Sequence, residues 1–265
     1  MSISSKIFPI RVSIMNNHKK TLVKLIKIAE NGDISAQCHL ADLYLRQEMD
    51  EGKKAAIPWL KKAAKQGDRW AQYQLGLAFQ EGLGVPKGMK CAMHYYELSA
   101  SQGYDSAQVN LGIIYANLKG SKRNLSEAIR LYRRAARHGN KNACYNLGLY
   151  YEIGRGVRQN YRQSFKWYLK AAKMGDGEAQ RIVGYCYHEG LGVREDCRSS
   201  VSWYKKGAKY GDVYAQYNLG LCYLDGDGVR RDERVAINWF KKAAAKGHTK
   251  AAQELFDLGI SGDWS

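Results

Sequence analysis

Amide side chains recur at one position of a 36-residue period in this chain. They are Gln74, Asn110, Asn146 and Asn218. An amide group both donates and accepts hydrogen bonds, so a row of amides on one surface can pair with the backbone of an extended peptide. The same side chains could instead bond to neighbouring helices or to water, and their spacing leaves both interpretations open.

Positive charge is concentrated in one part of the chain. The formal net charge is +17, and residues 104–175 hold 14 lysines and arginines, Arg123 among them, against three acids. A second pattern overlaps this basic block at 36-residue spacing: Lys122, Arg158, Arg194 and Arg230. Such a local excess indicates an anionic partner, and we expect an acidic protein or peptide. The alternative is a solvated surface that binds nothing.

Cysteine and histidine are the residues from which a metal site or a catalytic pair would be built. The six cysteines form no pair that repeats within the period, so we expect reduced structural thiols. Cys186, His188 and Cys197 lack the tight spacing of a metal site, and no histidine or cysteine is placed as a nucleophile with its base. The sequence therefore predicts no metal, no cofactor and no enzyme activity. Cys186 with Cys197 is the one pair whose bridging merits a test.

A glycine that returns every 36 residues defines the elements carrying these side chains: Gly67, Gly103, Gly139, Gly175, Gly211 and Gly247. A fixed period of this length indicates one stacked structural unit, and apolar residues at helical spacing predict two helices per unit. The expected units lie near residues 33–67, 68–103, 104–139, 140–175, 176–211 and 212–247.

Loop and core positions repeat with the same period. Four units join their helices by Gly-x-Gly-Val, and the residues expected to cap the second helices are Asn124, Asn160, Asp196 and Asp232. The second helices also carry bulky residues that we expect to bury against small ones: Trp59, Tyr95, Leu131, Trp167, Trp203 and Trp239.

These motifs resemble the Sel-one-like repeat family, a relative of the tetratricopeptide repeats. The resemblance rests on A-x-x-L-G-x-x-Y, G-x-G-V and W-Y/F-x-K-A-A-x-x-G, nearly complete in residues 215–247, and it covers residues 21–258. It implies an all-α, α/α solenoid: a right-handed superhelix of six helix-turn-helix repeats with half-repeat caps, whose first helices line a concave face. The first unit departs from the pattern at Pro58, where we expect its second helix to start late or bend. The third has ANLKGSKRN in place of the glycine loop.

If the first helices line a concave face, the amides above would face the groove. Trp70, on the same side, is expected to be an exposed anchor for a partner. Nucleic acid is disfavoured, because the aromatic residues at one repeated position are expected to be buried and unable to stack on bases. These are Tyr44, Phe79, Tyr115, Tyr151, Tyr187 and Tyr223.

The sequence thus favours a non-enzymatic, monomeric, cytoplasmic scaffold that binds a protein or peptide of acidic character. One alternative is a dedicated neutraliser, or immunity-type protein, of a toxin or effector. Another is a nucleic-acid or anionic-surface binder. Residues 1–20 are expected to be a flexible basic tail, residues 259–265 a short C-terminal tail, and no run is apolar enough to span a membrane.

Overall fold

A computed structural model describes residues 16–47, 49–118, 122–260 and 262, where every regular element is an α-helix and there is no strand. The predicted all-α fold is confirmed. The helices are α1 (Asn16–Glu30), α2 (Ile34–Leu45), α3 (Asp50–Lys65), α4 (Arg69–Glu81), α5 (Met89–Ser101), α6 (Asp105–Asn117), α7 (Lys122–Arg137), α8 (Lys141–Ile153), α9 (Tyr161–Lys173), α10 (Gly177–Glu189), α11 (Cys197–Lys209), α12 (Val213–Asp225), α13 (Glu233–Ala244) and α14 (Thr249–Asp257).

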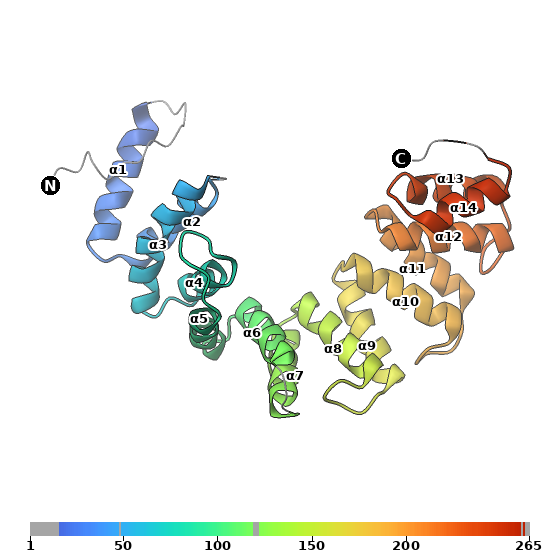
Figure 1. Ribbon diagram of the computed structural model, residues 1–265, viewed down its shortest axis with the longest axis horizontal. Coiled ribbons are helices and arrows are strands. Elements are labelled where there is room, and N and C mark those ends of the chain that lie inside the picture. Colours follow the sequence, from blue (N-terminus) through green and yellow to red (C-terminus); the bar gives the residue numbers. More distant parts are fainter. Residues whose placement is uncertain (1–15, 48, 119–121, 261, 263–265) are drawn as a thin grey trace. The chain divides into compact units, whose positions relative to one another are not determined.

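The chain forms two compact units, one ending at Ala107 and one beginning at Gln108 (Figure 1). In the first unit α2 packs on α3 and α4 on α5. In the second, α8 pairs with α9, α10 with α11 and α12 with α13, while α14 covers α13. Within each unit consecutive hairpins stack in chain order, as a solenoid requires. None of the described helices is both long and apolar enough to cross a membrane.

The helix starts are fixed by short polar side chains. Asp176 and Asp212 precede first helices, and each accepts a hydrogen bond from the backbone N–H three residues on, at 2.8 and 2.6 Å. Asn160, Asp196 and Asp232 do the same for the second helices, as predicted. These side chains satisfy N–H groups that have no partner within the helix.

Three expected boundaries differ from the structure. Asn124 is not a cap, because without a glycine loop the third unit starts α7 already at Lys122. Pro58 neither delays nor stops α3, which runs from Asp50 to Lys65. Pro58 and Lys54, whose carbonyl loses its N–H partner, are both exposed, so water can replace that bond. Helix α1 begins at Asn16, five residues before the expected domain start.

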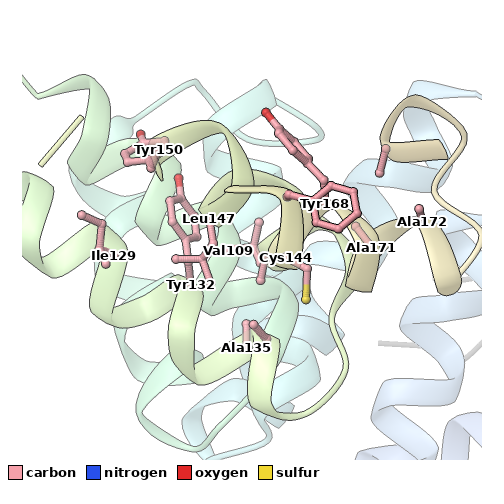
Figure 2. Packing of buried hydrophobic residues seen from close by; sticks show 14 of the residues in the cluster. Val109, Ile129, Tyr132, Ala135, Cys144, Leu147, Tyr150, Tyr168, Ala171 and Ala172 are labelled. Carbon is pink, nitrogen blue, oxygen red and sulfur yellow. The ribbon is translucent and has the colours of Figure 1, made fainter. Parts of the chain in front are cut away.

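In the five hairpins from α4–α5 to α12–α13, one aromatic ring of the core lies against a glycine, whereas the α2–α3 hairpin has Leu60 at the ring position. Tyr204 of α11 is 2% exposed, and a Cβ added to Gly184 of α10 would lie 2.6 Å from its ring. The other pairs, at the same separation in sequence, are Tyr96 on Gly76, Tyr132 on Gly112, Tyr168 on Gly148 and Phe240 on Gly220. Figure 2 shows Tyr132 and Tyr168 in the core of the second unit. The glycine therefore provides the space that lets the two helices of a contact approach closely.

The tryptophans are not the centre of this core, contrary to the sequence-based expectation. Trp167, Trp203 and Trp239 are only half-buried and pack at its margin. Each carries a lysine ammonium over its ring, Lys206 lying 3.9 Å from the Trp203 ring centroid. The ring one residue further along each helix points into the interior instead. At these three positions the large core residue was thus assigned one position too early, whereas Leu131 is 3% exposed, as predicted.

Buried glutamines join consecutive hairpins. Gln180 and Gln216 each donate from Nε2 to a carbonyl near the end of the preceding helix, Ala172 at 3.1 Å and Ala208 at 3.2 Å. The fourth repeat has Cys144 at this position, and the Lys170 ammonium reaches the equivalent carbonyl of Ala136 at 2.6 Å. The equivalent carbonyl groups at these helix ends therefore accept a hydrogen bond from a glutamine amide in some repeats and from a lysine ammonium in another.

Candidate protein-interaction surface

A continuous line of polar and aromatic contacts crosses the first helices of the second unit. We call it the first-helix strip, and its members are Tyr145 of α8, Glu178 and Arg181 of α10, Tyr214 and Tyr217 of α12, and His248 at the start of α14. It passes through three consecutive repeats and the terminal helix. A surface of this kind arises because equivalent positions of stacked repeats lie side by side.

Arg181 is the centre of the strip. Its guanidinium lies 3.6 Å from a Glu178 carboxylate oxygen and 3.7 Å from one of Asp212, and it stacks over the Tyr214 ring at 5.4 Å. The Arg181 side chain is 25% exposed, and its buried Nε makes no hydrogen bond among the described residues. Glu178 also accepts from the Tyr145 hydroxyl, whose pKa is raised by burial and then by this carboxylate. The strip is therefore held in place by interactions between repeats.

His248 ends the strip and caps the last helix. Its ring stacks on Tyr217 at 4.5 Å and meets Tyr214 edge-on at 5.1 Å. Its Nδ1 accepts a hydrogen bond from the Ala251 N–H at 3.1 Å, in the place of the aspartates that cap other first helices. Burial and the Lys250 charge lower the pKa of His248. A neutral imidazole is the form that can accept this bond.

Exposed side chains on the strip and beside it offer contact area to a partner. Tyr214 is 60% exposed, and Tyr185, on the same helix as Arg181, is 46% exposed. Large aromatic side chains with a polar end are enriched at protein interfaces because they bury much area at low entropic cost. The sequence analysis did not select Tyr214, Arg181, Tyr185 or His248.

The predicted amides are half-buried in their separate units: Gln74 in the first, and Asn110, Asn146 and Asn218 in the second. Asn218 hydrogen-bonds the Tyr204 hydroxyl, so this amide serves the core contact between α11 and α12. The peptide-binding role of the amides stays a prediction. Trp70 is half-buried and packs against the first unit's core, so it is not the freely exposed anchor that we expected.

The central basic block divides into engaged and unpaired charges. Arg130 pairs with Glu127 at 2.8 Å, and Arg155 donates to the Ala116 carbonyl at 2.6 Å. Of the predicted column, Arg158, Arg194 and Arg230 are exposed and have no ion pair within the described chain. The side chains of Lys122 and Arg123 lie outside the described residues. The sequence gives the number of these charges, but only the structure distinguishes those that have an internal partner from those that have none.

The aromatic residues used to disfavour nucleic acid are less buried than expected. Tyr44 is 7% exposed, but Phe79, Tyr115, Tyr151, Tyr187 and Tyr223 are half-buried. Their packing still engages them: Phe79 stacks on Tyr95 at 5.7 Å, and the Tyr151 hydroxyl accepts from Arg133 at 2.8 Å.

The cysteines carry free thiols. Cys186 is buried, and burial raises its pKa to about 12, whereas Cys197 lies near the surface with its Sγ 3.8 Å from Glu195. His188 faces Glu189 and Asp227. Across the described residues no three potential ligands come together as a metal site.

Comparison with known proteins gives a consistent result. Six consecutive segments match the Sel1 repeat: residues 34–68, 71–104, 105–140, 141–176, 177–212 and 213–248. No curated protein sequence matches the chain. Among solved structures, c5321, a protective antigen present in uropathogenic Escherichia coli strains that displays an SLR fold, is 32% identical over 92% of this chain, with a TM-score of 0.83. This chain spans about half, 53%, of that protein.

Two further structures extend the comparison. A Sel1 repeat protein from Oxalobacter formigenes is 31% identical over 85% of this chain and 91% of its own, with a TM-score of 0.72. The immunity protein Pa5087 from Pseudomonas aeruginosa is 17% identical over 79% of this chain and 80% of its own. Its TM-score of 0.48 is too low to carry an argument about function.

Proposed function

Because the chain belongs to the Sel1 repeat family, we propose that it is a non-enzymatic scaffold that binds a protein partner of acidic character along its first helices. The Sel1 repeat is a fold typical of protein-interaction scaffolds. Repeat stacks of this kind present long surfaces whose side chains can change while the core stays constant.

The first-helix strip is the observation that carries this proposal. Tyr214 in the strip and Tyr185 beside it are exposed, whereas Arg181 is fixed between two carboxylates. A surface whose polar groups are already ordered loses less conformational entropy when a partner binds. Tyrosine and arginine are also the residues most enriched among those that dominate binding energy.

The charge distribution supports an acidic partner. Arg158, Arg194 and Arg230 are exposed and unpaired within the described chain, and the whole sequence carries a formal charge of +17. An uncompensated positive surface accelerates the encounter with an acidic protein and disfavours basic ones. Binding should therefore weaken as salt rises.

A pull-down from the native host tests the proposal. The bait is the full chain, compared with Tyr185→Ala/Tyr214→Ala and with a variant changing the exposed α13 residue Asn238→Ala. We expect a partner that the Asn238→Ala bait retains and the double variant loses, with recovery falling as salt increases. A partner that binds all three baits equally at every salt concentration would contradict the proposed surface and its charge.

The complex recovered in the pull-down also distinguishes a neutraliser of one partner from an adaptor with several partners. Native mass spectrometry of the complex would show a single partner in fixed stoichiometry if the chain is a neutraliser, and several partners if it is an adaptor. Titration of single- and double-stranded oligonucleotides across salt concentrations tests nucleic-acid binding, for which a steep loss with salt is expected. Tight oligonucleotide binding without a protein partner would replace the proposal.

We also propose that the chain works as a monomer in a reducing compartment such as the cytoplasm. The six free thiols, three of them buried, support this location, because paired cysteines are typical of oxidising compartments. Light scattering measures the monomer mass directly, and fractionation of the native host measures the location.

A further inference from the structure

A basic hollow of about 620 Å³ lies in the second unit, where the loop after α10 meets α9. Arg162 and Lys166 of α9 and Arg194 of the loop supply its charge, and Phe165 and Val193 supply its apolar surface. Phe165 is 7% exposed and belongs to the core, so this apolar surface is fixed. The hollow thus combines three cations with a small apolar floor.

The three cations of the basic hollow have no internal partner. The side chains of Arg162, Lys166 and Arg194 are exposed, and within the described residues they make no ion pair or hydrogen bond. Like charges gathered in one place raise the local positive potential, and an anion that enters relieves the repulsion. The hollow is therefore electrostatically prepared for a negatively charged group.

The loop that carries Arg194 is held against α9. Gly192 has a φ of +74°, and a Cβ there would collide with the Tyr161 carbonyl, so backbone meets backbone at this point. The Asp196 N–H donates to the Tyr187 carbonyl at 2.8 Å, and the Asp196 side chain caps α11. Because the backbone is fixed on both sides of Arg194, a ligand would have to order only the Arg194 side chain and not the loop.

Equivalent positions on either side in the same unit lack this concentration of charge. One repeat earlier they are Ser126, Arg130 and Arg158, and one repeat later Arg198, Ser202 and Arg230. Arg130 is neutralised by Glu127, whereas Ser126 and Ser202 carry no charge. The backbone arrangement is the same in all three repeats. Of these three sets of equivalent residues, only Arg162, Lys166 and Arg194 are all cations without an ion pair among the described residues.

We propose that the basic hollow binds an acidic peptide segment of the partner, with a large apolar side chain against Phe165 and Val193 and flanking carboxylates on the three cations. This inference rests on the proposed scaffold function and assigns it a second contact, separate in residues from the first-helix strip. The apolar surface favours a peptide over a bare anion, because a phosphate would leave Phe165 and Val193 without a contact. Arginine and lysine both bind carboxylates as charged donors.

Titration with blocked synthetic peptides, followed by NMR of the full chain, tests the proposal without the natural partner. The probe is acetyl-Glu-Glu-Leu-Glu-Glu-amide, compared with peptides that replace all glutamates by glutamine or the leucine by serine. We expect shifts confined to residues 162–166 and 190–194. Affinity should fall about tenfold with the serine peptide, which loses one apolar contact, and more than about tenfold with the glutamine peptide, which loses every carboxylate. Inorganic phosphate and a short oligonucleotide should bind more weakly than the probe.

Charge-reversal variants complete the test. Lys166→Glu and Arg194→Glu should each weaken the probe about tenfold or more, because attraction is replaced by repulsion. Lys209→Glu is the matched control, since this exposed lysine has no partner among the described residues and lies outside the hollow, and it should change affinity less than about twofold. Thermal melting of each of the three variants checks that it is folded.

Three results would overturn the inference: equal binding of the glutamine peptide, phosphate or the oligonucleotide binding as tightly as the probe, or equal weakening by Lys209→Glu. The scaffold function is judged separately by the pull-down. A partner that the Lys166→Glu and Arg194→Glu baits retain, together with no probe binding, rejects the hollow and keeps the scaffold. Absence of any partner rejects the scaffold itself.

Discussion

The first-helix strip and the basic hollow place positive charge in different surroundings within one unit. In the strip, Arg181 lies between Glu178 and Asp212 and over the Tyr214 ring. In the hollow, Arg162, Lys166 and Arg194 make no ion pair with any described residue. A paired cation contributes to the fold that surrounds it, whereas an unpaired group of cations slightly opposes it and favours an external anion.

The difference shows that the net charge of a sequence counts cations that form ion pairs and cations that form none in the same way. Arg181 lies on α10 and Arg194 in the loop between α10 and α11, yet the first arginine is paired and the second is exposed without an ion pair among the described residues. Stability and binding should therefore respond to different substitutions. Three stability measurements test this difference, beginning with the packing of the helix that carries Arg181.

The largest effect is expected from filling the glycine under the strip. Gly184→Ala places a Cβ 2.6 Å from the Tyr204 ring, and overpacking of this kind costs about 2–3 kcal/mol of unfolding free energy. Gly177→Ala on the same helix is the control, because nothing lies within 4 Å of its added Cβ. It should be neutral or stabilise by about 0.5–1 kcal/mol. Urea denaturation measures both, and equal effects would reject the ring-on-glycine contact.

Removing the two kinds of arginine should give opposite results. Arg181→Ala loses two ion pairs and the contact with Tyr214, so we expect the unfolding free energy to fall by about 1–2 kcal/mol. Arg194→Ala should change it by less than about 0.5 kcal/mol, in the stabilising direction, because repulsion is removed. Denaturation at low salt measures the pair. A larger loss for Arg194→Ala than for Arg181→Ala would contradict the comparison.

The end of the strip should respond to pH through His248. Its folded pKa lies below the unfolded value of 6.5, so its contribution is present above pH 6.5 and is lost as the pH falls through the folded pKa. A protonated Nδ1 can no longer accept from the Ala251 N–H, and an N-cap is worth about 1 kcal/mol.

His248→Asn is the matched variant for this prediction, because asparagine caps a helix without titrating. Between about pH 8 and pH 5, the wild-type chain should lose up to about 1 kcal/mol more unfolding free energy than His248→Asn. Parallel pH profiles of the two proteins would show that His248 does not act as a titrating cap.

Much of the fold could be predicted from the sequence because it repeats. The glycine period defined the hairpins, and the spacing of Asn160, Asp196 and Asp232 identified their caps. Asn124 and Pro58 were misjudged because one depended on a missing glycine loop and the other on which side of α3 faces water. The residue spacing therefore predicts where a second helix starts only in repeats that have the Gly-x-Gly-Val loop.

The core ring and the site were harder to predict for a physical reason. Neighbouring residues such as Trp203 and Tyr204 are both aromatic, and only the position of Gly184 on another helix decides which one is buried. The constant separation between each glycine and its ring was a signal that could have been used. Contacts such as Arg181 with Asp212 depend on side chains from different repeats, so no local pattern contains them.

Position-specific photo-crosslinking in the native host tests the central claim most directly, that the first-helix face of the second unit holds the partner. A benzophenone amino acid replaces Tyr185 in one strain and Asn238, exposed on α13, in another. The account predicts a crosslinked partner from position 185 that is lost when Tyr214→Ala is added, and none from position 238. A partner crosslinked from position 238 and not from position 185 would contradict it.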